Sequence, residues 1–577
     1  MTCRPHFAPH GAGFIMSKIQ QPYSSDSRTR YPILSDAAEP RRAGRSRRAS
    51  KNATNSGVRP ALRVVAVAPP DCIQGKKDKR ALNSSDPASL FNACRVAASR
   101  ALSRTGAWAN SNWAGETRSK IRANFLLLYS LDDIPAFIEM MEREKPNVLL
   151  LGTMTLCMPG AIECAKIAKE MFGNDIVVVL GGRHATETIY LWHGKARQAA
   201  DVVHHRASPA RLIREERLPP VFDVVVSGDG EFFIAELGEI LEHKRTPYDL
   251  EAIFAEFDRA TPGDWIASLP ASSLEVVSAG IPINANELPP LASLFGVSAA
   301  FDVFGGRMTA HVFSDTGRGC VYDCDFCSEK SGVTGGLRDI ANAAKRLYGQ
   351  LEDAVNVIEE DHPDRGASAF VEDSILLGGS PRALDTLCEL LEAKPLPIEF
   401  GAQFTVDQVL GREHQIARLA RVGLRYIFIG LETFDPDEIG GMSKNIGSRN
   451  GSWQARSERV FQILAQSGIA CGCALLFGLG ESHHSRIALL DAVVEARQQT
   501  GCPAFLSANW AVQHPLRGQT GGLEYDYLDW GTPAGPYLDN FHHFGEASLN
   551  YCLENQVPPE IHELEEIVHR LRTFQSS

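Results

Sequence analysis

Three cysteines lie close together in the segment SDTGRGCVYDCDFCSEKSG, residues 314–332. Cys320, Cys324 and Cys327 have the spacing C-x3-C-x2-C. Thiolates prefer soft metals and iron–sulfur clusters. Three thiolates in one short loop can bind three irons of a [4Fe–4S] cube, and the fourth iron then stays open for a substrate. The loop is therefore the strongest candidate for a metal site in the chain.

A structural zinc site and incidental thiols are the alternatives for this loop. Structural zinc is bound by four ligands, commonly arranged as C-x2-C pairs. Here the spacing is three and then two, and the next cysteine is Cys388. The pattern therefore favours an iron–sulfur cluster. Cys471 and Cys473 lie in an apolar strand and point to one face, so we expect them to be core residues.

The cysteine loop follows the first strand of a series of strands and helices that runs over residues 306–515. Such a series predicts a partial (β/α)6 barrel, in which chemistry takes place at the C-terminal ends of the strands. The loop lies at one of these ends. The strand candidates are 308–315, 367–373, 397–404, 426–433, 470–480 and 504–512.

With Phe326 before its last cysteine, the loop resembles that of the radical S-adenosylmethionine (radical SAM) superfamily. The resemblance implies that the open iron binds the amino and carboxylate groups of SAM. Reductive cleavage then yields methionine and a 5′-deoxyadenosyl radical. Strand-end glycines also serve close packing of strands on helices. The SAM-binding residues that the resemblance implies are Phe326, Glu372 and Asp373 in FVEDS, Glu432 and Thr433 in YIFIGLET, and Gly478 and Glu481 in LLFGLGE.

Residues 59–245 contain a second alternation of strands and helices. Their continuous β-branched runs, such as ALRVVAVAPP at 61–70, are typical of buried parallel strands. The pattern predicts an α/β, Rossmann-like, doubly wound sheet, in which ligands bind at the C-terminal ends of the strands.

Such a domain ahead of a radical SAM barrel resembles the cobalamin-binding domain of class B radical SAM enzymes. The D-x-H-x-x-G motif that supplies a histidine to cobalt is absent, and His184 is expected to be a hydrogen-bonded loop histidine. A Rossmann-like domain without a ligand is the alternative. The cobalamin-binding residues that the resemblance implies are Thr153, Thr155, Gly181, Gly182, Gly228, Asp229, Gly230 and Glu231.

Three further segments complete the predicted organisation. Residues 1–58 carry ten Lys and Arg and three Asp and Glu, and they read as a disordered basic tail. Residues 246–305 read as a linker with short elements. Residues 516–577 read as a C-terminal capping segment, whose aromatic stretch at 524–544 could cover the barrel mouth.

Composition narrows the classes of function and partner. The formal net charge of −12 argues against a general nucleic-acid binder. No apolar run reaches the roughly 18–20 residues that span a bilayer, so no membrane partner is expected. Thirteen thinly spread cysteines indicate thiols or metal ligands in a reducing compartment, and we expect the protein in the cytoplasm.

The combined resemblance implies a cobalamin-dependent radical SAM enzyme with a [4Fe–4S] cluster, SAM and cobalamin. Methyl transfer from methylcobalamin to an unactivated carbon, or to phosphorus, of a small natural-product intermediate in antibiotic biosynthesis is the first hypothesis. Electrons would come from an external donor such as flavodoxin or ferredoxin. Three alternatives stay open: a radical rearrangement or ring contraction, a radical SAM enzyme without cobalamin, and a non-catalytic iron–sulfur sensor.

Overall fold

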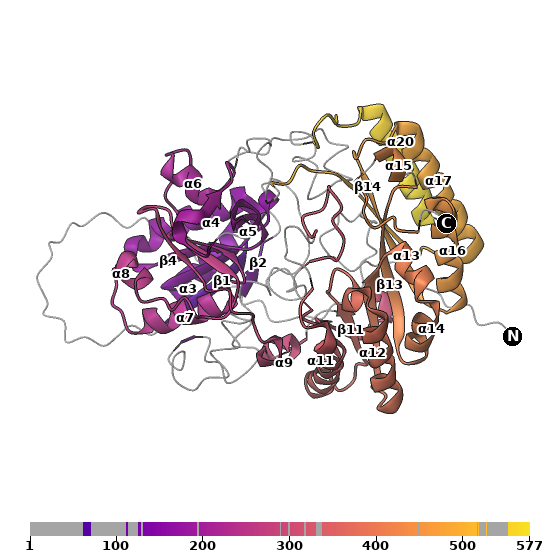
Figure 1. Ribbon diagram of the computed structural model, residues 1–577, viewed down its shortest axis with the longest axis horizontal. Helices are drawn as coiled ribbons and strands as arrows, with labels where there is room; N and C mark the ends of the chain where they lie inside the picture. The colour runs from indigo at the N-terminus through magenta and orange to yellow at the C-terminus, as the bar shows by residue number, and fades with distance from the viewer. Residues whose placement is uncertain are drawn as a thin grey trace, which may run out of the picture.

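The protein folds into two α/β units, the first built on a largely parallel sheet and the second on a parallel sheet (Figure 1). The predicted basic tail and most of the aromatic stretch at 524–544 lie outside the described residues. This computed structural model describes residues 62–70, 111–112, 125–128, 131–192, 196–288, 290–297, 300–316, 319–330, 337–434, 436–439, 441–447, 450–515, 517, 527 and 552–576.

The first sheet has the strand order β2-β1-β3-β4-β7-β8-β9. Its first five strands are parallel, with the 2-1-3-4-5 order of one class of doubly wound fold, so this prediction is confirmed. The sheet extends beyond residue 245, because two antiparallel strands come from the predicted linker. The strands are β1 (Val64–Ala68), β2 (Phe125–Leu127), β3 (Val148–Gly152), β4 (Val177–Gly181), β7 (Val224–Gly228), β8 (Trp265–Leu269) and β9 (Leu274–Val277).

Helices cover both faces of this sheet, which explains its continuous apolar runs. In β1, Val65 and Val67 pack in the core under α3 and α4, whereas Val64 and Ala66 pack in the core under α7 and α8. Alternate side chains therefore enter opposite cores. The remaining elements of this unit are α3 (Ile134–Glu144), α4 (Met158–Phe172), α5 (Arg183–Thr188), β5 (Ile189–Leu191), β6 (Val202–His204), α6 (Pro209–Arg214), α7 (Glu231–Glu242) and α8 (Leu250–Phe254).

The second sheet contains six parallel strands in sequence order, from β10 to β15. This arrangement confirms the predicted partial (β/α)6 barrel, because each strand pairs with the next after a crossover. The strands are β10 (Met308–Val312), β11 (Ala367–Val371), β12 (Ile398–Phe404), β13 (Leu424–Glu432), β14 (Ala470–Phe477) and β15 (Phe505–Trp510).

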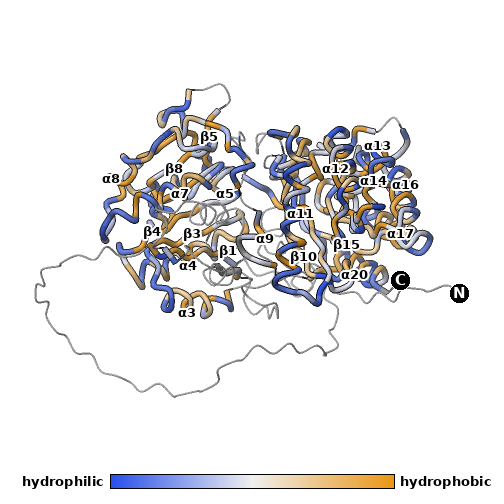
Figure 2. Tube along the Cα trace, turned by 90° about the horizontal axis from the view of Figure 1, so that it is seen from below, coloured by the Kyte–Doolittle hydropathy of each residue, from blue (hydrophilic) through white to orange (hydrophobic). Residues whose placement is uncertain are grey.

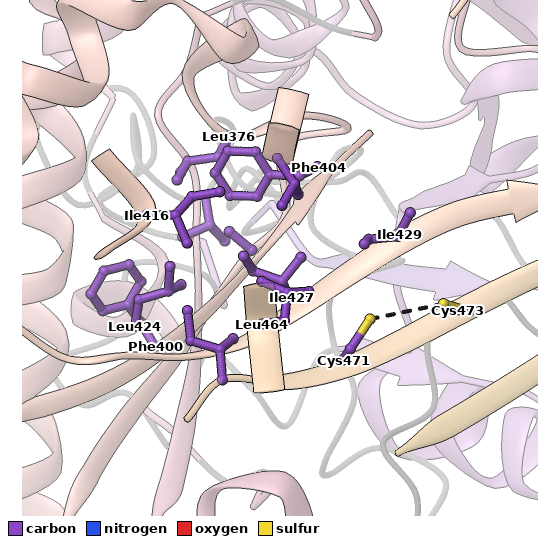
Figure 3. Close-up of a cluster of buried hydrophobic side chains, with 14 of the residues drawn as sticks. Leu376, Phe400, Phe404, Ile416, Leu424, Ile427, Ile429, Leu464, Cys471 and Cys473 are labelled. Carbon is purple, nitrogen blue, oxygen red and sulfur yellow. Dashed lines mark hydrogen bonds between the residues drawn. The ribbon is translucent and has the colours of Figure 1, made fainter. Parts of the chain in front are cut away.

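Outward-facing strand residues form the core of the barrel with the surrounding helices. Cys471 and Cys473 of β14 are both fully buried in this core, as predicted, with their sulfurs 3.8 Å apart (Figure 3). At the C-terminal end of the described chain, α20 lies beside α17 (Figure 1), where Arg497 stacks 4.4 Å over the Phe574 ring. The helices are α9 (Leu291–Phe295), α11 (Ile340–Asp361), α12 (Pro381–Ala393), α13 (Val406–Gly411), α14 (Glu413–Arg421), α15 (Pro436–Ile439), α16 (Trp453–Gln466), α17 (His483–Thr500) and α20 (Ile561–Ser576).

A layer of aromatic rings crosses the concave face of the second sheet. Phe301 contacts Phe370 of β11, which contacts Tyr426 of β13, and Tyr426 contacts Phe505 of β15; the ring centroids are 6.0–6.1 Å apart. Gly472 leaves room for this layer, because a Cβ there would lie 2.0 Å from the Tyr426 hydroxyl.

The hydropathy of the chain follows this layout. In Figure 2 the strands β3 and β4 are largely hydrophobic, whereas helices such as α11 and α17 mix hydrophobic and hydrophilic residues. Among the described residues, no helix combines the length and the apolar character needed to cross a membrane.

Candidate functional site

The cysteine loop follows β10, and hydrogen bonds between its own backbone groups stabilise it. The Cys320 N–H donates to the Glu329 carbonyl at 2.7 Å, and the Cys327 N–H donates to the Cys324 carbonyl at 3.1 Å. The N–H groups of Tyr322 and Glu329 point to the sulfurs of Cys320 and Cys327, each at 3.4 Å. Donors aimed at sulfur stabilise negative charge on a thiolate.

The environment of these thiols suits a cluster of positive metal ions. Burial raises the pKa of Cys320, and it raises the pKa of Cys327 to about 12. Bound iron would replace the protons and compensate the thiolate charge. Within the described ranges, no three His, Cys, Asp or Glu side chains converge as they would on one metal ion. The donor set fits a [4Fe–4S] cube, in which each thiolate binds a separate iron.

A segment after β13 packs against the cysteine loop. The Ser443 hydroxyl accepts from the Asp323 N–H at 2.7 Å and lies 3.6 Å from the Cys324 sulfur. Lys444 donates to the Gly430 carbonyl at 2.7 Å and pairs with Glu432, and both side chains of this pair are nearly buried. The structure therefore brings Glu432, a predicted SAM contact, to the loop through residues that sequence reasoning missed.

The predicted acidic pair after β11 has partners within the protein. Glu372 accepts from or donates to His311 Nδ1 at 2.6 Å, inside the barrel. Asp373 accepts from the Ser314 N–H at 3.1 Å, so it fixes the start of the cysteine loop. Burial raises the pKa of Asp373 to about 6, although this N–H bond opposes the shift. Both acids thus stand next to the loop, and Asp373 positions it.

The predicted contacts after β14 form a compact loop. The Glu481 carboxylate accepts from the N–H groups of Gly478 and Leu479 at 2.7 and 2.8 Å. Arg486 donates to the same carboxylate at 2.6 Å and stacks over Trp510. Gly478 has φ +76°, and a Cβ there would lie 2.3 Å from the Trp510 indole nitrogen. These residues shape the loop at the end of the strand.

Two remaining predicted SAM contacts border the cysteine loop and β13. Phe326 is partly buried against the barrel core. Thr433 is buried directly after Glu432, and its N–H donates to the Leu431 carbonyl at 2.8 Å.

In the N-terminal unit, protein backbone fills the space beside two predicted glycines. Gly182 has φ +94°, and a Cβ there would lie 2.5 Å from the Thr153 nitrogen. Gly228 has φ +83°, and its Cβ would lie 2.0 Å from the Asp264 carbonyl oxygen. Contact between neighbouring loops explains both glycines without a ligand. Gly181 ends β4, while Gly230 caps α7 and Glu231 begins it.

Other predicted cobalamin contacts take part in a buried network. The Thr155 hydroxyl lies 2.9 Å from His184 Nδ1, and His184 Nε2 lies 2.9 Å from the Tyr527 hydroxyl. His184 makes the hydrogen bonds that the sequence predicted, but it lies in helix α5 and not in a loop. Burial lowers its pKa to about 3. The Thr153 hydroxyl donates to the Met154 carbonyl at 2.8 Å.

Ion pairs join the strand-end loops of the two units. Asp229 pairs with Arg338 at 2.9 Å, and Arg183 pairs with Glu329 of the cysteine loop. One turn along α5, Glu187 is fully buried, and neither carboxyl oxygen has a hydrogen-bond partner. Burial raises the pKa of Glu187 to about 8, and burial lowers the pKa of nearby His514 to about 4.

Sequence reasoning missed Arg183, Glu187, Glu329, Ser443 and Lys444. Arg183 stands inside the predicted motif VLGGRHATE, and Lys444 stands in a glycine-rich stretch after a strand. Arg183 stands directly after the predicted strand-end glycines, and Glu329 stands two residues after Cys327, and these are the local signals that the sequence offered.

The family comparison concerns the second unit. Residues 315–493 match the family model described as the radical SAM superfamily. The match begins five residues before Cys320 and ends within α17.

Curated relatives match parts of the chain. An uncharacterized methyltransferase of Pyrococcus horikoshii is 22% identical over 334 residues, which cover 58% of this chain and 62% of that protein. Biotin synthase 1 of Paracoccus denitrificans is 25% identical over 182 residues, which cover 32% of this chain and 51% of that protein. The chain thus spans about half to three fifths of these relatives.

Two solved structures are similar at low identity. The cobalamin-dependent S-adenosylmethionine radical enzyme OxsB, with aqua-cobalamin and S-adenosylmethionine bound, is 15% identical with a TM-score of 0.45, over 75% of this chain and 52% of that one. The radical S-adenosylmethionine methyltransferase TsrM from Kitasatospora setae, with cobalamin and a [4Fe–4S] cluster bound, is 14% identical with a TM-score of 0.45, over 78% and 72%.

Proposed function

Residues 315–493 form a radical SAM domain, and from this premise we propose a cobalamin-dependent radical SAM methyltransferase. Its substrate would be an unactivated carbon, or phosphorus, of a small natural-product intermediate. The observation that carries the proposal is the loop of Cys320, Cys324 and Cys327, with N–H groups aimed at two of its sulfurs. The name of the Pyrococcus horikoshii relative, a methyltransferase, supports the reaction class.

The residues of the chain would divide the work around the cluster. When bound, the cluster and its cosubstrate supply one-electron cleavage of a sulfonium, and cobalamin supplies a methyl group. Cys320, Cys324 and Cys327 would hold three irons. Ser443 and Asp373 hold the loop in place through backbone N–H groups. The Lys444–Glu432 pair puts a nearly buried cation and anion beside the loop, where they would bind charged groups of SAM.

Cobalamin is proposed for the crevice at the C-terminal end of the first sheet. In doubly wound sheets a ligand binds where the strand order reverses, which here lies between β1 and β3. The pairs Arg183–Glu329 and Asp229–Arg338 bring the strand-end loops of this sheet to those of the barrel. A ligand in the crevice would therefore lie next to the radical SAM site.

The proposed reaction also needs an electron donor and a reducing compartment. An external one-electron donor such as flavodoxin or ferredoxin would reduce the cluster, and no nucleic acid or membrane takes part. The cytoplasm suits free thiols, because it keeps them reduced.

Anaerobic reconstitution of the full chain with iron, sulfide and hydroxocobalamin tests the function. We expect iron–sulfur absorption, a retained corrinoid band after gel filtration, and formation of 5′-deoxyadenosine and S-adenosylhomocysteine from SAM. Formation of deoxyadenosine without S-adenosylhomocysteine would indicate a rearrangement instead of methyl transfer. Absence of the corrinoid band after gel filtration would exclude cobalamin as a cofactor. Zinc in place of iron would refute the radical chemistry.

A further inference from the structure

Glu329 is the residue on which the cysteine loop depends for two of its backbone contacts. Its carbonyl accepts from the Cys320 N–H at 2.7 Å, and its N–H points to the Cys327 sulfur at 3.4 Å. A change in the position of Glu329 would therefore move Cys320 and Cys327, two of the three predicted cluster ligands.

The side chain of Glu329 is held from two other parts of the molecule. One carboxylate oxygen pairs with Arg183 at the start of α5, 146 positions earlier in the chain. The other accepts from the Ser374 hydroxyl at 3.3 Å, just after β11. Arg183 also interacts electrostatically with Cys327. The N-terminal unit thereby places a positive charge beside the cysteine loop.

Close contacts hold the backbone around Arg183. Gly182 turns the chain with φ +94° against Thr153, and the His184 N–H donates to the Thr153 carbonyl at 3.2 Å. The His184 ring is locked between Thr155 and Tyr527. Arg183 is therefore presented from a fixed position, which suits an electrostatic role.

We propose that Arg183 is a positioning residue through which the N-terminal unit tunes the reduction of the iron–sulfur cluster. The inference rests on the proposed function and deepens it. Reduction adds one electron to the cluster, from the [4Fe–4S]2+ to the [4Fe–4S]+ state, and the external donor supplies that electron. A nearby cation stabilises the more negative state, and an unpaired carboxylate destabilises it. Arg183 favours reduction in both ways, because it adds a positive charge and neutralises Glu329.

The test is a redox titration of the reconstituted full chain, followed by the electron paramagnetic resonance signal of the reduced cluster. Arg183→Gln should shift the midpoint potential to more negative values, with an about tenfold lower reduction equilibrium constant, or about 59 mV for one electron. Glu329→Gln should shift it the opposite way. The double variant should return close to the wild type, and Arg183→Lys should keep most of the potential.

Arg338→Gln is the matched control, because it removes the ion pair with Asp229 between the units and keeps the backbone hydrogen bond from the Arg338 N–H to the Thr316 carbonyl. It should leave the potential unchanged. An intact cluster with an unchanged potential in Arg183→Gln would overturn the inference. So would an equal shift in Arg338→Gln, or a double variant that stays shifted, because both would indicate general loosening of the interface. If Arg183→Gln does not fold, the difference in potential between Glu329→Gln and the double variant decides, because these two variants differ only at residue 183. A wild type that forms no cluster refutes the proposed function instead.

Discussion

The strand ends of the two sheets meet, yet they use their residues differently. At the barrel, Ser443, Asp373 and Glu329 bind the backbone of one cysteine loop. In the N-terminal unit, Gly182 and Gly228 make room for neighbouring backbone. Glycine shows only that something approaches closely, whereas a cysteine triplet specifies the chemistry of what it binds.

The largest effect is expected at the cysteines. Replacing Cys320, Cys324 or Cys327 with Ala should abolish 5′-deoxyadenosine formation, because each would bind one iron of the cluster. Cys471→Ala is the matched control, since that thiol is buried in the barrel core and should leave the product intact. Chromatography of the reaction mixture measures the product. Normal deoxyadenosine formation in any of the three variants would show that the cysteine loop does not hold the cluster. The contrast between this loop and the glycines of the N-terminal unit would then fail.

The next largest effect is expected at Gly182. A Cβ there would collide with Thr153 backbone at 2.5 Å, so Gly182→Ala should lower the free energy of unfolding by about 3 kcal/mol. Gly173 also has a positive φ but nothing within 4 Å of a Cβ, so Gly173→Ala should cost only about 1–2 kcal/mol. Urea unfolding measures both. Equal costs, together with loss of bound corrinoid in Gly182→Ala alone, would show instead that this glycine serves the ligand.

The smallest effect is expected at Glu187. Its pKa is raised by burial from 4.5 to about 8, so the carboxyl is protonated in the folded chain and ionised in the unfolded chain between these values. Stability should therefore fall as pH rises through that window. Glu187→Gln should raise the free energy of unfolding by about 2 kcal/mol at pH 8.5 and change it little near pH 4.

Unfolding measured at several pH values tests this linkage. Glu170→Gln, at an exposed position of α4, is the matched control and should leave the pH profile unchanged. A parallel profile for Glu187→Gln and the wild type would contradict the buried, protonated carboxyl.

Periodicity and spacing were sufficient for the architecture and for the cysteine loop. Buried β-branched runs predicted the parallel strands, because both faces of such a strand are covered by helices. They did not place β8 and β9 in the first sheet. β8 is fully buried but pairs antiparallel to β7, outside the alternation of strands and helices, and the edge strand β9 has only four residues.

Contacts between distant residues lay beyond the sequence. Arg183 and Glu329 are 146 positions apart, and no local spacing relates them. The partners of Glu372 and Glu481 were hidden for a related reason. A carboxylate that binds His311 or backbone N–H groups has the same one-letter code as one that faces a ligand.

The aromatic layer on the concave face of the barrel affects where SAM and its products can bind and leave. Rings from Phe301 to Phe505 cross the sheet from its first side to its last, and Tyr426 fills the space beside Gly472. Among the described residues, this apolar layer is a barrier to a charged molecule such as SAM. Binding and release of SAM and its products are therefore expected on the other side of the barrel, where the cysteine loop pairs with the N-terminal unit.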